Sequence, residues 1–159
     1  MKDSLRTGAT FGLTSGTITT LGLMVGLNSG THSRKVVIGG ILTIAVADSF
    51  SDALGIHISE EAENVHTTKQ IWMTTAATFF SKFFFALTFL LPILFLNLPD
   101  AIMASIIWGG ALLAILSYFM AKHQGEKPWK VILEHLLIMA VVINLTYLVG
   151  NQIASFVEE

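Results

Sequence analysis

The chain has 159 residues, of which 53% are hydrophobic and 13% charged, and its formal net charge is −2. Because soluble domains usually carry about a quarter of charged residues, this composition excludes an ordinary soluble domain, and the near-neutral charge gives no indication of nucleic-acid binding. The absence of cysteine excludes disulfides and thiolate metal sites.

Five segments are long and apolar enough to be transmembrane helices, which need about 20 residues to cross about 30 Å of hydrocarbon. They lie at about 8–28, 36–58, 71–96, 101–121 and 129–150. Pro92 is expected to break the third span near its end, because proline lacks a backbone donor and clashes with the preceding turn. Short, turn-forming connections join the spans. The sequence therefore predicts an all-α, polytopic integral membrane protein with one domain, residues 1–159.

The first span has no charge and is rich in small residues. Gly12 and Gly16 stand four apart, and Gly22 and Gly26 repeat this spacing in a second register. Small residues at this spacing let two helix backbones approach closely in a bilayer. Two interpretations fit this pattern. The span could simply pack against other helices, or it could line a polar path with its hydroxyl-bearing residues. A glycine-rich helix at a subunit interface would satisfy both interpretations.

The second span carries Asp48 and Asp52, at a depth where an ionised carboxylate costs a few kcal/mol. With about 100° per residue, a helix that continues past the membrane surface places several polar or small residues on one stripe. These residues are Asp48, Asp52, Gly55, Ser59, Glu63 and His66. From Asp48 to Glu63 the stripe would span roughly 22 Å. It predicts a row of oxygen ligands from mid-bilayer to the cytoplasm.

Carboxylates four residues apart are neighbours on a helix and can share one cation, whereas they repel each other without a cation or a proton. We therefore predict that Asp48 and Asp52 are both the transport site and the proton carriers. Lys82 interrupts the apolar third span at a similar depth, and we expect it to pair with Asp48. The pair could be purely structural, or Lys82 could neutralise the empty site and yield to an incoming cation.

Acidic and imidazole side chains gather at the end of the second span. Glu60, Glu63 and His66 are candidate metal-binding residues at the mouth of the site, because a local negative charge concentrates cations. The alternative interpretation is a solvated helix end.

Basic residues in the connections predict the orientation of the chain. One side would hold Lys2, Arg6, Lys69, Lys122, Lys127 and Lys130, and the other Arg34 and Lys35. Because cytoplasmic loops are enriched in Lys and Arg, we expect a cytoplasmic N-terminus and a C-terminus outside, in the cell membrane of a prokaryote.

Two segments carry a resemblance to a known family. Residues 11–27 form a Gly- and Leu-rich run that ends in Val-Gly-Leu. Ser51, Leu54, Gly55 and Glu63 match a second pattern, Ser-Met-Gly-Leu-Gly, a short spacer and then Ser-Glu-Ala. Together they resemble the first two helices of the vacuolar iron transporters. The resemblance implies a homodimer that exchanges Fe²⁺ or Mn²⁺ for protons along the subunit interface, with Glu63 at the cytoplasmic mouth.

The chain departs from this family's pattern in three respects. Phe11 stands where the family usually has an Asp, and only residues 64–70 replace the cytoplasmic metal-binding domain of the plant members. Asp52 falls where the family has a metal-contacting Met, and a carboxylate shifts the preference toward harder ions. Fe²⁺ and Mn²⁺ are the expected ions, with Ca²⁺ and Mg²⁺ as open alternatives.

The sequence thus predicts a transporter that exports a divalent cation from the cytoplasm in exchange for protons. We expect no permanently bound cofactor. An enzyme is not expected, because no nucleophile–base set, phosphate loop or His-rich cluster is present. Two alternatives stay open, a passive cation channel and a non-transporting membrane scaffold or assembly protein whose Asp–Lys pair serves only packing.

Overall fold

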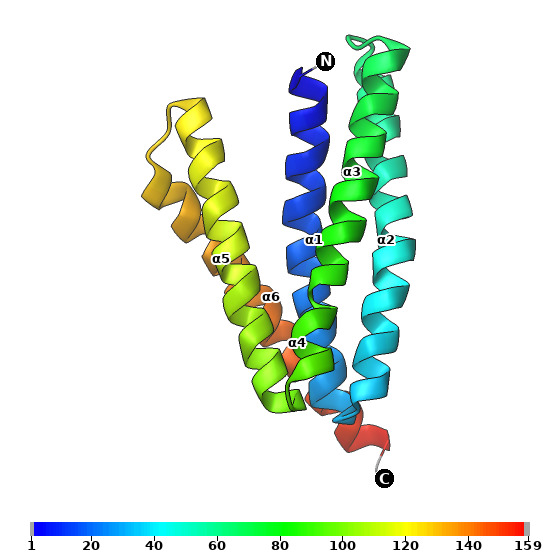
Figure 1. Ribbon diagram of the computed structural model, residues 1–159, viewed down its shortest axis with the longest axis vertical. Helices are drawn as coiled ribbons and strands as arrows, with labels where there is room; N and C mark the ends of the chain where they lie inside the picture. Colours follow the sequence, from blue (N-terminus) through cyan, green and yellow to red (C-terminus); the bar gives the residue numbers. More distant parts are fainter. Residues whose placement is uncertain (1, 158–159) are drawn as a thin grey trace.

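The computed structural model describes residues 2–157 and is helical almost throughout (Figure 1). Its helices are α1 (Lys2–Thr31), α2 (Arg34–Glu63), α3 (Thr68–Thr88), α4 (Leu90–Phe95), α5 (Leu98–Gln124) and α6 (Pro128–Val157). Within the described residues, five stretches are long and apolar enough to cross a membrane, and α3 and α4 together form one of them. The predicted all-α fold with five transmembrane helices is therefore confirmed, although the helices extend beyond most of the predicted bounds.

The third span is interrupted at Phe89, just before Pro92, as the sequence predicts. Proline has no N–H to donate to the carbonyl of Thr88, and its ring clashes with that carbonyl. The hydroxyl of Thr88 donates to the carbonyl of Phe85 (2.7 Å) and accepts from the indole N–H of Trp108 (3.1 Å). The bond from Trp108 ties the interrupted region to α5.

Helix α1 is central to the bundle and packs against α2, α3, α5 and α6 (Figure 1). The N-terminus, the α2–α3 turn and the α5–α6 connection lie at one end of the bundle, and the C-terminus lies at the other. At the first of these ends, α5 leans away from α1. The two groups of basic residues that predict the orientation therefore lie at opposite ends of the bundle.

Glycines allow α1 to pack closely against two different helices. In its N-terminal half, Gly12 and Gly16 face α3, and a Cβ atom at Gly16 would lie 3.1 Å from Cγ of Lys82. In its C-terminal half, Gly22 and Gly26 face α6, and a Cβ atom at Gly26 would lie 3.3 Å from the carbonyl oxygen of Thr146. All four glycines predicted to support packing therefore lie at helix–helix contacts.

The apolar core lies mainly toward the end of the bundle that holds α4. It consists of Leu21, Met24, Val37, Ile41, Phe89, Ile93, Ala101, Leu113 and Met139. Toward the opposite end, the interface of α1 with α3 buries polar side chains instead, including Thr74, Thr78 and Lys82. The candidate site lies at this polar interface.

Candidate functional site

The side chain of Lys82 is almost fully buried, with 1% exposed, and its ammonium group lies between two carboxylates. Its Nζ atom is 2.5 Å from Oδ2 of Asp48 and 2.5 Å from Oδ2 of Asp52. The same Nζ donates to Oγ of Ser15 at 2.9 Å. Of the three protons of the ammonium group, two are donated in hydrogen bonds to Asp52 and Ser15, and Asp48 contributes an ion pair. The expected pair of Lys82 with Asp48 is present, and Asp52 joins it.

Ser15 completes this group, which we call the charge cluster (Ser15, Asp48, Asp52 and Lys82). Its hydroxyl donates to Oδ2 of Asp52 at 2.6 Å. Sequence reasoning missed Ser15 as a site residue, although it stands directly before Gly16, on the part of α1 that packs against α3. The absence of a side chain at Gly16 brings the backbone of α1 close enough for this hydroxyl to reach the cluster.

The two aspartates are held differently. Oδ2 of Asp52 accepts hydrogen bonds from both Ser15 and Lys82. Oδ2 of Asp48 is buried and forms the ion pair with Lys82 but makes no hydrogen bond. The Asp48 side chain is also the more exposed of the two, at 27% against 19% for Asp52. Asp52 is thus the anchored carboxylate, and Asp48 is the more accessible one.

The formal charges of the cluster do not cancel, because two carboxylates face one ammonium group. An uncompensated charge in a membrane-spanning segment is costly and is normally neutralised by a partner, an ion or a proton. A buried ion pair is also a poor source of stability by itself, because desolvation opposes the attraction between the charges. The cluster is therefore suited to accept one further positive charge.

The polar stripe predicted along α2 does not face the interior over its whole length. Asp48 and Asp52 are partly buried, but Gly55, Ser59 and Glu63 are exposed, and a Cβ atom at Gly55 would contact nothing within 4 Å. The helix ends at Glu63 because Asn64 adopts a left-handed conformation with φ 53°. The helix continues past the predicted span as far as Glu63, so the condition under which His66 would belong to the stripe is not met.

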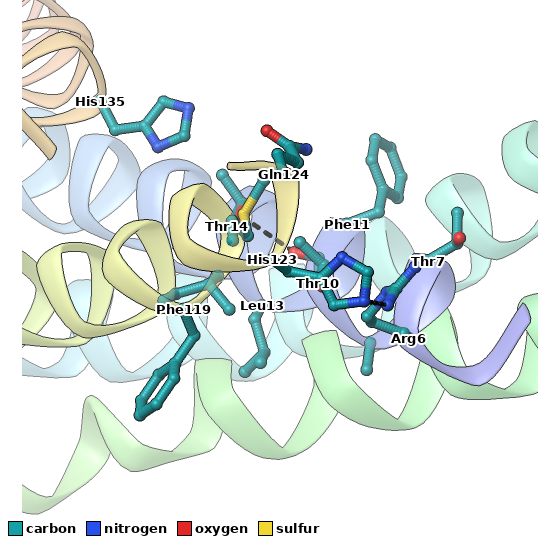
Figure 2. Close-up of a pocket in the computed structure, with 13 residues that line it drawn as sticks. Arg6, Thr7, Thr10, Phe11, Leu13, Thr14, Phe119, His123, Gln124 and His135 are labelled. Carbon is teal, nitrogen blue, oxygen red and sulfur yellow. Dashed lines mark hydrogen bonds between the residues drawn. The ribbon is translucent and has the colours of Figure 1, made fainter. Parts of the chain in front are cut away.

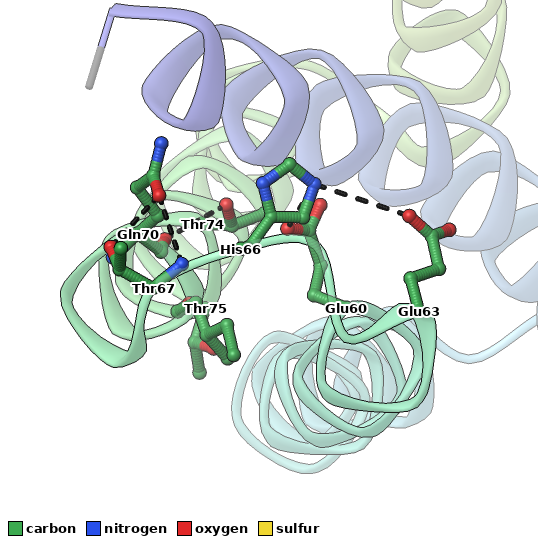
Figure 3. Close-up of polar contacts among 8 residues, drawn as sticks. Glu60, Glu63, His66, Thr67, Gln70, Thr74 and Thr75 are labelled. Carbon is green, nitrogen blue, oxygen red and sulfur yellow. Dashed lines mark hydrogen bonds and ion pairs between the residues drawn. The ribbon is translucent and has the colours of Figure 1, made fainter.

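Glu60, Glu63 and His66 form a second group, the end cluster, at the α2–α3 turn (Figure 3). Nε2 of His66 lies 3.3 Å from Oε2 of Glu60 and 3.9 Å from Oε2 of Glu63. Glu60 is buried, whereas 62% of the Glu63 side chain is exposed. Along α2, Glu60 lies about 12 Å beyond Asp52 at 1.5 Å per residue. The structure thus brings the predicted residues together as two separate groups.

No three His, Asp or Glu side chains within residues 2–157 are arranged to hold a metal ion. In the charge cluster, the ammonium group of Lys82 lies between the two carboxylates, where a shared cation would otherwise lie. A cation that bound Asp48 and Asp52 would have to displace this ammonium group.

A cavity of about 850 Å³ lies on another side of α1, between α1 and the helices α5 and α6 (Figure 2). Its polar lining includes Thr10 and Thr14 of α1 and His135 of α6, whose Nδ1 lies 2.7 Å from the hydroxyl of Ser117. A hydrogen bond between Arg6 and His123 links α1 to α5 beside it. Neither aspartate of the charge cluster lines this cavity.

The chain matches no protein-family model and no curated protein. Its own side chains are therefore the basis for a functional assignment.

Proposed function

We propose that the protein transports a divalent cation across a membrane in exchange for protons, with the charge cluster as the transport site. One observation carries this proposal. The Nζ atom of Lys82, 1% exposed, lies 2.5 Å from a carboxylate oxygen of both Asp48 and Asp52, within membrane-spanning helices. Two negative charges and one positive charge leave one negative charge that a proton or a cation can neutralise.

The proton and the divalent cation compete because they neutralise the same carboxylates. In the empty site, Lys82 and one proton balance the charges of Asp48 and Asp52. An incoming divalent cation displaces that proton and takes the place of the ammonium group between the two carboxylates, and Lys82 releases a proton as it leaves, so that two protons are exchanged for each cation and the charge of the site stays balanced. Carboxylate oxygens suit Mn²⁺ among the transition metals, as well as Mg²⁺ and Ca²⁺. When the cation leaves, two protons return, and Lys82 pairs with the carboxylates again.

The direction, the ion and the assembly are further parts of the proposal. The basic residues at the N-terminal end of the bundle favour a cytoplasmic N-terminus and a C-terminus outside. The resemblance to vacuolar iron transporters favours export of Fe²⁺ or Mn²⁺ from the cytoplasm by a homodimer. The end cluster would then collect cations at the cytoplasmic mouth, because its carboxylates attract them before they reach the membrane.

The test is an assay in proteoliposomes that contain an internal pH dye and a metal-sensitive dye. Addition of Mn²⁺ to the wild-type protein should produce metal uptake together with proton release. Asp52→Asn should abolish both fluxes while the protein stays folded, since the amide keeps the shape but not the charge. Glu126→Gln is the control, because Glu126 is exposed in the α5–α6 connection. Unchanged fluxes in Asp52→Asn would remove Asp52 from the mechanism.

The same assay separates the two alternatives. A passive channel would conduct Mn²⁺ without moving protons and would not saturate at modest concentrations. A scaffold whose ion pair serves only packing would show no flux in any variant, and it would tolerate the joint change Asp48→Ala and Lys82→Ala without functional loss. Coupled, saturable flux that disappears with the cluster is expected only of the exchanger.

A further inference from the structure

A groove on the surface of α1 and α2 leads to Asp48. It has a volume of about 590 Å³ and is lined by Leu23 and Leu27 of α1 and by one face of α2 between Val36 and Ser51, which includes Thr43 and Asp48. At 1.5 Å per residue, that stretch of α2 is about 22 Å long. The groove therefore runs from the end of the bundle that carries the α1–α2 connection to the middle of the membrane-spanning region.

The exposed part of Asp48 faces this groove. Its Oδ2 atom is buried against Lys82, so the exposed 27% of the side chain belongs to its remaining atoms. Thr43 and Ser51 add hydroxyl groups to the lining, and both are exposed. A carboxylate that faced hydrocarbon would lack solvation at mid-bilayer, which is costly. Water in the groove would solvate it.

On the side of the α2–α3 turn, the charge cluster is covered by close packing of α1 against α3. A Cβ atom at Gly12 of α1 would lie 2.5 Å from the carbonyl oxygen of Thr78, and the side chains of Thr74 and Thr78 are buried. The Phe50 ring of α2 contacts the Phe79 ring of α3 with 4.6 Å between the ring centroids, but Phe50 is 62% exposed, so this contact lies on the outer face of α2 and α3. The cluster is thus open along the groove, and α1 and α3 are in close contact between it and the α2–α3 turn.

We infer that this groove is a water-filled crevice through which protons and the transported ion move between Asp48 and the membrane side of the α1–α2 connection. The role of the crevice in transport rests on the proposed function, but the existence of the crevice can be tested separately. Asp48 is then the residue that exchanges ligands with this side, while Asp52, held by Ser15 and Lys82, remains the anchored partner. In the proposed orientation, this side is the outside.

The chain contains no cysteine, so each single-cysteine variant carries one thiol. Thr43→Cys places that thiol in the groove, and Leu42→Cys places it at the neighbouring position, which is exposed but does not line the groove. His32→Cys reports the side of the α1–α2 connection, and Glu126→Cys reports the other side. A membrane-impermeant maleimide is applied to the full-length protein in intact cells and in inverted vesicles.

Thr43→Cys should react only in the preparation in which His32→Cys reacts. It should react at least about tenfold faster than Leu42→Cys, because the reactive thiolate forms in water and not in lipid. Equal rates for Thr43→Cys and Leu42→Cys would overturn the inference, since lipid or a second subunit would then fill the groove. Labelling of Thr43→Cys from the side of Glu126→Cys would also overturn it.

Transport measurements distinguish the existence of the crevice from its role as the route of the ion. Thr43→Trp should block the groove and stop metal-coupled proton flux, whereas Leu42→Trp should leave the flux intact. Flux that persists in Thr43→Trp would overturn the crevice as the route. If Thr43→Cys showed the expected one-sided labelling but the wild-type protein transported no metal, the crevice would stand and the proposed function alone would be contradicted.

Discussion

The charge cluster and the end cluster both use carboxylates of α2, but they hold them in different ways. In the charge cluster, one buried ammonium group lies 2.5 Å from both aspartates. In the end cluster, the imidazole of His66 lies 3.3 and 3.9 Å from two glutamates, and one of these is largely exposed. The same chemistry therefore occurs at two depths.

Depth determines what each group can do. Removal of one partner from a buried pair leaves an unpaired charge and is strongly destabilising, whereas exposed pairs are screened and contribute about 0–1 kcal/mol. Changes in the charge cluster should therefore affect both stability and transport, and changes at the exposed Glu63 of the end cluster should affect mainly the capture of ions.

The largest effect is expected from Lys82→Ala, which leaves Asp48 and Asp52 facing each other without their ammonium partner. Loss of one member of a buried pair costs about 3–5 kcal/mol, and transport should cease. Unfolding in detergent, followed by circular dichroism, measures the first effect, and the proteoliposome assay measures the second.

The control removes every charge of the cluster at once, as Lys82→Met with Asp48→Asn and Asp52→Asn. Replacement of a whole buried ion pair by uncharged residues is often neutral, so this variant should recover most of the lost stability but no transport. A triple variant as unstable as Lys82→Ala would show that the charges are not the cause.

The second effect concerns the close approach of α1 to α3 that builds the charge cluster. Gly12→Ala should destabilise the protein by about 2 kcal/mol, because the new Cβ atom would overlap the carbonyl oxygen of Thr78. Gly55→Ala is the matched control, since its Cβ atom would meet nothing, and it should stabilise α2 by about 0.5–1 kcal/mol. Thermal unfolding in detergent measures both, and equal shifts of the same sign would contradict the prediction.

Hydropathy and charge predicted the coarse features of this molecule. The five spans and the break near Pro92 follow from local chemistry, which is the same in any packing arrangement. The pairing of Lys82 with Asp48 was also predictable, because a charge in a membrane-spanning helix requires a partner at the same depth.

Features that depend on how the helices face each other were not predictable. The contact of Ser15 with the cluster requires the rotation of α1 against α3, and the groove requires the angle between α1 and α2. The end of α2 is a different case. Asn64 is a residue that favours the left-handed conformation at helix ends, so this signal was present in the sequence but was outweighed by the polar stripe.

A smaller effect is expected from Ser15→Ala, which removes one of the two hydrogen bonds to Oδ2 of Asp52 and one acceptor of Lys82. Hydrogen bonds to charged groups are worth more than neutral ones, and we expect a loss of about 1.5 kcal/mol. Ser15→Thr, which keeps the hydroxyl, should restore part of it. Transport should slow but persist, because both aspartates remain. If Ser15→Ala abolished transport completely, Ser15 would be a ligand of the ion and not a positioning residue.

The smallest effect is expected from Glu63→Gln in the end cluster. Glu63 is 62% exposed and 3.9 Å from His66, so its loss should change the free energy of unfolding by no more than about 0.5 kcal/mol. If Glu63 attracts cations to the mouth, the initial rate of Mn²⁺ uptake should fall at low ionic strength, and the difference should vanish in about 0.5 M salt, where charges are screened within a few Å. A defect that persisted at high salt would mean that Glu63 binds the ion directly, and the contrast between the two clusters would then lie in burial and not in role.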